Sequence, residues 1–341
     1  MHRRFYIRAL TFILVLIAAN ILLDQVYKNF VVHNILNNAK DKDFLEYDDT
    51  LTYLSMGNSH NTVNTYILEN SYNYFSPAEN YVQTYYKLKY ILENTEKKPE
   101  NLLLYIDLSS FGPRAANYFE HNSYWVKYLD FFELARIKDD RDVLANWVEG
   151  RFFSYAGNYR DFKLSLVYLV KIGKLELHHG YRPPRNFKNF AYNKPEGVGI
   201  LSDESTYDWS DAIPVDSTER MHRARQKSSI YFAKDAYFDS SVAIYFEMIL
   251  EKCRQHDVNV ILLRAPVTKE YFQDVSQMIP VELIYDSIKK IYSKYPNVIQ
   301  VLDYHDLYFD HPEYFFDADH LNPVGAEEFT KRLRCDLEKQ Y

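Results

Sequence analysis

The chain has 341 residues, and its 47 Asp and Glu outnumber its 40 Lys and Arg, so the formal net charge is −7. These charges are spread without long runs, which argues against a nucleic-acid partner because nucleic-acid binding needs a basic face. The 32 Tyr and 22 Phe, against only 9 Gly, predict many half-buried aromatic side chains in a globular part with a large core.

The N-terminus has the pattern of a membrane anchor. Residues 1–4 are basic, and residues 9–23 form an apolar run with only two polar residues. Together with its apolar flanks, this run predicts a transmembrane anchor over residues 5–27. A cleaved signal peptide is the alternative, although residues 18–20 make a poor cleavage site because the apolar run continues after them. The basic residues before the span predict a cytoplasmic N-terminus and a globular domain in the periplasm or at the cell surface.

The next segments predict a stalk and the first part of a sheet. Residues 28–49 are polar and rich in Asn, Asp and Lys, and we interpret them as a stalk. Strands are then expected at residues 51–56, 72–75 and 101–107, and helices at residues 62–70 and 81–94. This alternation indicates an α/β fold with a parallel sheet and helices on both of its faces.

The alternation stops and later resumes. Residues 111–230 contain no apolar strand pattern but several helical stretches, and predict a mainly helical insertion with helices at residues 125–134, 143–153 and 162–177. Further helices are expected at residues 240–256, 281–295 and 323–337, and further strands at residues 258–263 and 298–302. The α/β domain therefore has a first part at residues 50–110 and a second part at residues 231–341.

Two short motifs carry the candidate chemistry. Ser59 follows the first predicted strand and is expected at a strand-to-helix turn, beside helix-start N–H groups that can hold an oxyanion. Asp317 lies three residues before His320, close enough to orient its imidazole as a base for Ser59. A structural role is the alternative reading, with Ser59 as a helix cap and Asp317 as a loop residue.

Other polar residues follow the ends of predicted strands. His60 follows the first strand, Asp107 and Ser109 follow the third, and Arg264 follows the fourth. In open parallel sheets, ligands bind outside the carboxyl ends of the strands, so these side chains are expected to line one crevice. They are candidates for contacts with the substrate.

These motifs resemble those of the SGNH (GDSL-like) hydrolase superfamily over residues 50–110 and 235–341. Gly57-Asn58-Ser59 matches its first block, in which Asp often stands at the position of Asn58, and residues 317–326 resemble its last block. The resemblance implies a flavodoxin-like three-layer α/β/α fold with Ser59 as nucleophile, Asp317 as acid and His320 as base. The Gly and Asn that complete the family's oxyanion hole are not evident.

Three residues fall near the positions where those two oxyanion residues would be expected. Ser76 falls near the position of the Gly, and Asp107 or Ser109 near that of the Asn. One oxyanion donor commonly contributes about 3–4 kcal/mol to catalysis, so this departure bears directly on activity.

The resemblance, with the anchor, implies a membrane-bound serine esterase or O-acyltransferase that acts on acyl esters, of which acetyl is the expected class, of a cell-envelope glycan. It implies no cofactor and no bound metal, and a multi-span membrane acyltransferase as a further partner. The alternatives are a non-catalytic glycan-binding or assembly component with the same fold, and a metal-dependent hydrolase that uses the acid- and His-rich residues 303–320.

The sequence contains two cysteines, Cys253 and Cys335. Their spacing fits neither a metal site nor a redox motif. A location outside the cytoplasm permits a disulfide between them, but the sequence does not establish one.

Overall fold

The computed structural model describes residues 2–30, 44–47, 50–76, 79–112, 128–129, 132–133, 216–232 and 238–339. Most of the predicted stalk lies outside these ranges. The helices expected at 143–153 and 162–177, and most of the one at 125–134, also lie outside the described residues. The described elements belong to an N-terminal helix and to an α/β body, which are presented separately.

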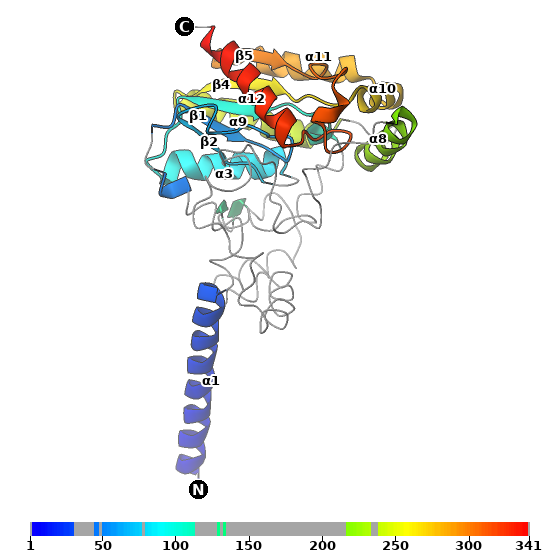
Figure 1. The fold of residues 1–341 in the computed structure, drawn as a ribbon. Coiled ribbons are helices and arrows are strands. Elements are labelled where there is room, and N and C mark those ends of the chain that lie inside the picture. Colours follow the sequence, from blue (N-terminus) through cyan, green and yellow to red (C-terminus); the bar gives the residue numbers. More distant parts are fainter. Residues whose placement is uncertain are drawn as a thin grey trace. The chain divides into compact units, whose positions relative to one another are not determined.

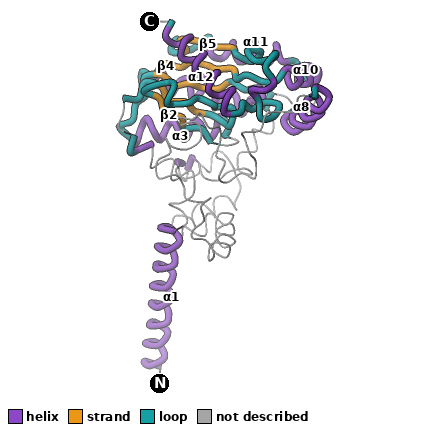
Figure 2. The backbone as a smooth tube through the Cα atoms, viewed as in Figure 1, coloured by secondary structure: helices purple, strands orange, loops and turns teal. Residues whose placement is uncertain are grey.

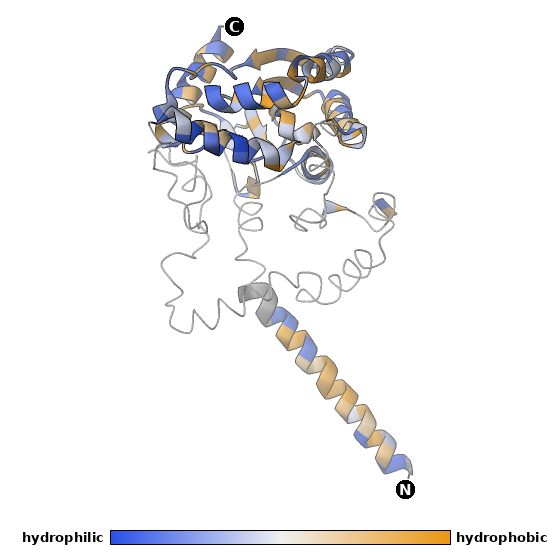
Figure 3. Ribbon diagram, turned by 90° about the vertical axis from the view of Figure 1, so that its right-hand side faces the viewer, coloured by the Kyte–Doolittle hydropathy of each residue, from blue (hydrophilic) through white to orange (hydrophobic). Residues whose placement is uncertain are grey.

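The N-terminal helix α1 spans His2–Phe30. Its segment Arg3–Gln25 has 23 residues and is long and apolar enough to cross a membrane. At a rise of about 1.5 Å per residue it measures about 35 Å, compared with about 30 Å for the hydrocarbon core of a bilayer. Figure 3 shows mainly apolar residues along the middle of this helix. A membrane anchor and a signal sequence both fit these properties.

The α/β body is built on one parallel five-stranded sheet in the order β2-β1-β3-β4-β5 (Figure 1). The predicted strands are all present, as β1 (Tyr53–Met56), β2 (Ser71–Asn73), β3 (Asn101–Tyr105), β4 (Asn259–Arg264) and β5 (Val298–Asp303). β3 is buried along its whole length, and β5 at the edge has alternating exposed residues. The central apolar runs therefore became buried strands, as their composition predicted.

Helices flank this sheet (Figure 2). They are α3 (Tyr81–Asn94), α8 (Ser217–Tyr231), α9 (Ser240–Gln255), α10 (Lys269–Met278), α11 (Val281–Tyr292) and α12 (Pro323–Glu338), with short 3₁₀ turns η2 (Leu108–Phe111) and η7 (Pro312–Tyr314). α3 packs on α9, and the rings of Tyr81 and Phe246 lie 5.2 Å apart in their interface. Aromatic side chains thus form part of the core.

Two expectations about helices need correction. Neither α8 nor α10 was among the helices expected from the sequence, although Thr268 caps the first turn of α10 by accepting a hydrogen bond from the Tyr271 N–H at 3.3 Å. The helix expected at residues 62–70 is absent, and this segment forms turns. Asparagine side chains bind its backbone: Asn73 donates to the carbonyls of Asn61 and Val63 at 3.3 and 3.0 Å. Such local bonds compete with helix formation.

The strand order places a topological switch point between β1 and β3. From β1 the chain goes to β2 on one side and then returns to β3 on the other side. Crevices at such points are where open α/β sheets bind their ligands. A ligand site is therefore expected at the sheet edge formed by the loops that follow β1 and β3, at residues 57–64 and 106–112.

Candidate active site

The loop after β1 presents Ser59 from a turn held by its own backbone and asparagine side chains. Gly57 has φ +135°, a conformation that L side chains rarely adopt, and its carbonyl accepts a hydrogen bond from the Ser76 N–H at 3.0 Å. Asn58 Oδ1 accepts from the His60 N–H at 2.9 Å. Ser59 lies in this tight turn and not at a helix start, so the expected helix-start oxyanion site is wrong.

The loop before α12 is fixed by the start of that helix. Asn322 caps α12 by accepting a hydrogen bond from the Gly325 N–H at 3.0 Å, and its own N–H donates to the Tyr314 carbonyl at 2.9 Å. A Cβ at Gly325 would lie 2.2 Å from that carbonyl oxygen, so only glycine fits there. These contacts set the path of the loop that carries Asp317 and His320.

The two loops bring Ser59, His320 and Asp317 into one chain of contacts. Ser59 Oγ lies 2.8 Å from His320 Nε2. His320 Nδ1 lies 2.9 and 3.0 Å from the two carboxylate oxygens of Asp317. Asp317 Oδ1 also accepts hydrogen bonds from the N–H groups of Asp319 and His320, which fixes its orientation. The predicted geometry is confirmed: the serine and the carboxylate lie on opposite nitrogens of one imidazole.

The electrostatics define the tautomer of His320. Burial opposes its protonation, but Asp317 and Asp319 outweigh burial and raise the pKa of the His320 imidazole. Burial alone would raise the pKa of Asp317, yet the charges of His320 and Lys227 help to hold that pKa below its ordinary value. Asp317 is therefore an ionised acceptor, so Nδ1 of a neutral His320 carries the proton and Nε2 is left to accept the Ser59 hydroxyl.

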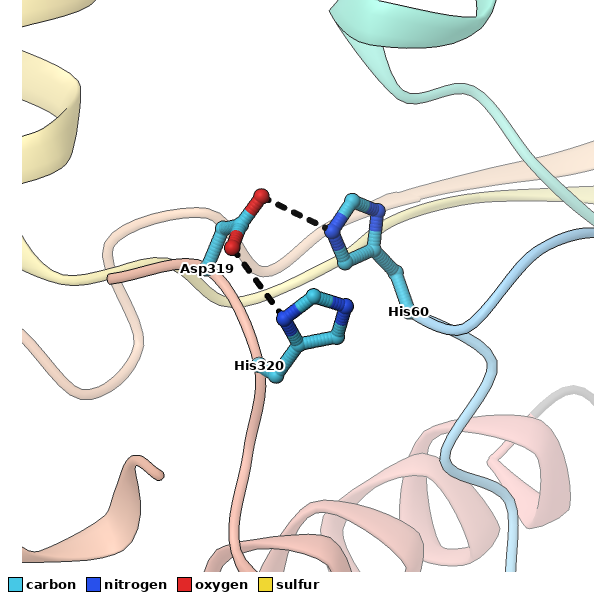
Figure 4. A group of neighbouring side chains, drawn as sticks. All are labelled: His60, Asp319 and His320. Atoms are coloured by element: carbon cyan, nitrogen blue, oxygen red, sulfur yellow. Dashed lines mark hydrogen bonds and ion pairs between the residues drawn. The ribbon is translucent and has the colours of Figure 1, made fainter. Parts of the chain in front are cut away.

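His60 forms a second carboxylate–histidine arrangement in the same site (Figure 4). Its Nδ1 lies 2.8 Å from Asp107 Oδ2, and its Nε2 lies 3.1 Å from Asp319 Oδ2. Burial opposes protonation of His60, but the two carboxylates raise its pKa from 6.5 to about 10. The rings of His60 and His320 lie 4.6 Å apart between centroids. His60 is thus a buried imidazolium at neutral pH.

Sequence reasoning missed two charged residues of this cluster. Asp319 lies between the two histidines, with Oδ1 3.1 Å from His320 Nδ1 and Oδ2 on His60 (Figure 4). Lys227 of α8 places Nζ 3.0 Å from Asp317 Oδ2 and 3.1 Å from Asp319 Oδ1. The motif already contained Asp319, but nothing in the sequence around Lys227 indicated a site 90 residues away.

The three residues expected near the missing oxyanion positions do not lie as oxyanion donors beside Ser59 in the contacts described. The Ser76 N–H donates to Gly57, and its hydroxyl accepts from Lys87 Nζ at 3.5 Å. Asp107 faces His60 and, as a carboxylate, accepts hydrogen bonds only. Ser109 lines a small cavity beside His60. The contacts of Ser76 and Asp107 are therefore structural and do not supply oxyanion donors.

Arg264 lies at the same sheet edge, outside the contacts of Ser59. Its guanidinium bonds Asp303 at 3.0 Å and stacks over the Tyr285 ring at 3.9 Å. It borders a cavity of about 40 Å³ that Ser109, His60 and His305 also line. The four strand-end residues expected in one crevice, His60, Asp107, Ser109 and Arg264, all line this cavity, as predicted. His60 also lies near His320 of the serine site.

The cluster also contains groups that can ligate a metal. One ligand atom each from His60, Asp319 and His320 lies within 4.8 Å of the others. The ammonium of Lys227 already contacts the same carboxylate, which disfavours a divalent cation there. In the stretch proposed for a metal-dependent hydrolase, His305 pairs with Asp303 and His311 with Glu313, each with a residue two positions away. These pairs do not form a ligand set.

The two cysteines are both free thiols. Cys253 is buried on α9, and burial raises the pKa of its thiol. Cys335 is exposed on α12. The disulfide that an external location would permit is not formed.

Comparisons with known proteins give no further guide. No protein-family model matches the chain, and no curated protein is significantly similar to it. Statements about function therefore depend on the geometry and on the motifs.

Proposed function

We propose that this protein is a serine esterase or O-acyltransferase of SGNH type that acts on acyl esters, with acetyl as the expected class, of a cell-envelope glycan. The observation that carries the proposal is the 2.8 Å contact between Ser59 Oγ and His320 Nε2, with Asp317 on the other ring nitrogen. An unassisted serine hydroxyl is a weak nucleophile near neutral pH, and an adjacent base held by a carboxylate activates it.

The proposed reaction has two acyl transfers. His320 Nε2 takes the proton of Ser59 as Oγ attacks the acyl carbonyl, and then gives that proton to the departing alcohol. Asp317 holds the imidazole in the required tautomer and stabilises its protonated form. The acyl-enzyme then reacts with water in an esterase or with a sugar hydroxyl in a transferase, and both outcomes share the first step.

The proposal extends to fold and location. The strand order 2-1-3-4-5 and the fully buried β3 support a three-layer α/β/α arrangement of flavodoxin type. The apolar α1 supports a membrane anchor with a cytoplasmic N-terminus and an extracytoplasmic α/β body. The expected partners are the membrane, a glycan and a multi-span membrane acyltransferase. Protease treatment of intact spheroplasts should cut the α/β body; protection until lysis contradicts this topology.

Ester hydrolysis by the purified full-length protein in detergent micelles tests the chemistry. The wild type should release acetate from an activated acetyl ester and from an O-acetylated envelope glycan. Ser59→Ala and His320→Ala should abolish this release, and Asp317→Asn should reduce it strongly because the tautomer is lost. Turnover that persists in Ser59→Ala contradicts the proposal.

A non-catalytic glycan-binding component is the second candidate. The observation that favours it is that Ser76 and Asp107 are hydrogen-bonded to Gly57 and His60. The oxyanion donors of the SGNH pattern therefore have no counterpart at these two positions. The two candidates differ in cells: a catalytic serine makes glycan modification depend on Ser59, whereas a binding component supports modification equally well as Ser59→Ala.

A further inference from the structure

Lys227 approaches the candidate base from a part of the chain that neither catalytic motif contains. Its Nζ lies 3.5 Å from His320 Nδ1, in addition to its ion pairs with Asp317 and Asp319. The lysine side chain is 21% exposed, and Asp319 is fully enclosed, so water screens these charges weakly. The ammonium is therefore the cation nearest to the Nδ1 side of the imidazole among the contacts described.

The helix that carries Lys227 is firmly attached to the α/β body. Arg220 of α8 forms an ion pair with Glu270 of α10 at 2.7 Å. Further along the same helix, the Ser228 hydroxyl donates a hydrogen bond to Asp274, also on α10. These bonds lie on both sides of Lys227, so the lysine is held in place by its helix and not only by its own ion pairs.

The charges around His320 explain what Lys227 contributes. Nδ1 faces two carboxylates, Asp317 at 2.9 Å and Asp319 at 3.1 Å. Two nearby negative charges stabilise a protonated imidazole, and a protonated imidazole cannot take the proton of Ser59. His60 balances one oxygen of Asp319 only. A cation between the two carboxylates offsets part of their charge and so favours the neutral imidazole.

We propose that Lys227 is a positioning residue that holds both carboxylates and weakens their effect on His320, which favours the neutral imidazole that can act as a base. This inference rests on the proposed function, in which His320 is that base. It goes beyond it by adding a fourth charged residue, from α8, to the Ser59 site. The charge of Lys227 opposes the effect of Asp317 and Asp319 on the pKa of His320.

The other groups that face His320 give the expected direction. Asp317 and Asp319 come from its own loop, His60 and Ser59 from the loop after β1, and the phenol of Tyr271 of α10 lies in the field of Asp319. Of these and Lys227, only Lys227 and His60 are cations. Removing the lysine charge should therefore raise the pKa of His320 further.

The experiment measures the pH dependence of Ser59 labelling by a fluorophosphonate, with the full-length protein in micelles. The wild-type rate should rise with pH through the pKa of His320. In Lys227→Met the midpoint of the curve of labelling rate against pH should move up by about 1–3 pH units, because removal of one nearby charge has effects of that size. Lys227→Arg keeps the charge and should stay near the wild-type midpoint. An unchanged midpoint in Lys227→Met overturns the inference.

Lys252→Met is the matched control. Lys252 of α9 has a similarly enclosed side chain and an ion pair with Glu93 at 2.7 Å, remote from the contacts of Ser59. Its removal should leave the midpoint unchanged. If Lys227→Met does not fold, Lys227→Gln takes its place, since glutamine removes the charge but keeps a hydrogen-bond donor.

A second readout separates this inference from the proposed function. The NMR signals of the histidine ring carbons, followed against pH, report the pKa of His320 without any reaction. The His320 signal is assigned as the one that is missing in His320→Gln. A higher His320 pKa in Lys227→Met with no labelling in the wild type keeps the inference and rejects the proposed function. Labelling of the wild type with an unshifted His320 pKa in the variant keeps the proposed function and rejects the inference.

Discussion

The loop after β1 and the loop before α12 each bring one histidine to the same sheet edge, in different surroundings. His60, from the first loop, has a carboxylate on each ring nitrogen, at 2.8 and 3.1 Å. His320, from the second, has carboxylates on Nδ1 only and the Ser59 hydroxyl on Nε2. A ring enclosed by two carboxylates stays protonated and balances charge, whereas a ring between a carboxylate and a hydroxyl can exchange a proton. The groups that surround each histidine, and not its residue type, therefore determine its role.

The largest expected difference between the two histidines is in catalysis. His320→Ala should lower the turnover of an activated ester by about 10⁴-fold or more, as loss of a base from a serine triad does. His60→Gln should leave more than a hundredth of the wild-type turnover, because His60 does not contact the nucleophile. Steady-state rates of the two variants at one pH check this. Equal losses of turnover in both variants would show that the two histidines do not have these different roles.

The next expected effect is on stability, and here the order reverses. His60→Gln leaves Asp107 without its buried cation and Asp319 with Lys227 as its remaining cation, which should cost about 3–5 kcal/mol in the free energy of unfolding. His320→Gln should cost less, because Lys227 still neutralises Asp317 and Asp319. Urea titration of both variants at neutral pH measures the difference. A larger loss in His320→Gln contradicts the charge assignment.

The stabilisation by His60 should depend on pH with a defined sign. Its folded pKa of about 10 lies above the ordinary value of 6.5, so protonation favours the folded state. The contribution is fully present below about pH 6.5 and is lost as pH rises through about 10. The gap in unfolding free energy between wild type and His60→Gln should therefore shrink between these values. A gap that widens with pH would mean that His60 is neutral in the fold.

The smallest expected effect is at His305, a third histidine near this edge. It is paired with the half-exposed Asp303 at 2.8 Å and does not contact Ser59 or His320. His305→Gln should change the unfolding free energy by no more than about 1 kcal/mol, the usual size for a point substitution, because the partly enclosed ring packs against Phe272 but holds no buried charge in place. Ester turnover should be unchanged. A metal-dependent loss of activity in this variant would revive the metal-hydrolase alternative.

Strands with strong patterns could be predicted from the sequence, and loop conformation could not. The apolar runs that became β3 and β4 are continuous and bounded by turn residues, so their type was clear. A helix was expected at residues 62–70, although β-branched residues and Asn, which favour helices weakly, make up most of this segment. Their backbone is instead bound by side chains such as Asn73, which lies in β2 and meets them only in the folded protein.

The residues of the site also differ in how far the sequence could predict them. Ser59, Asp317 and His320 were identified because each belongs to a short motif with its own chemical logic. His60 and Asp107 were identified singly, but their pairing crosses 47 residues and was not foreseen. Lys227 lies on a polar helix with no motif, and its role follows only from its distances to Asp317 and Asp319. Long-range pairing of charges is what local sequence patterns do not encode.

Covalent labelling of Ser59 measures whether His320 activates its hydroxyl. The full-length protein in micelles is treated with a fluorophosphonate, digested, and its peptides are analysed by mass spectrometry. A single adduct should form rapidly on Ser59 in the wild type and in Lys252→Met, and it should be lost in His320→Ala. An adduct that forms equally fast in His320→Ala, or no adduct at all on Ser59 of the folded wild type, would contradict the activation of Ser59 by His320.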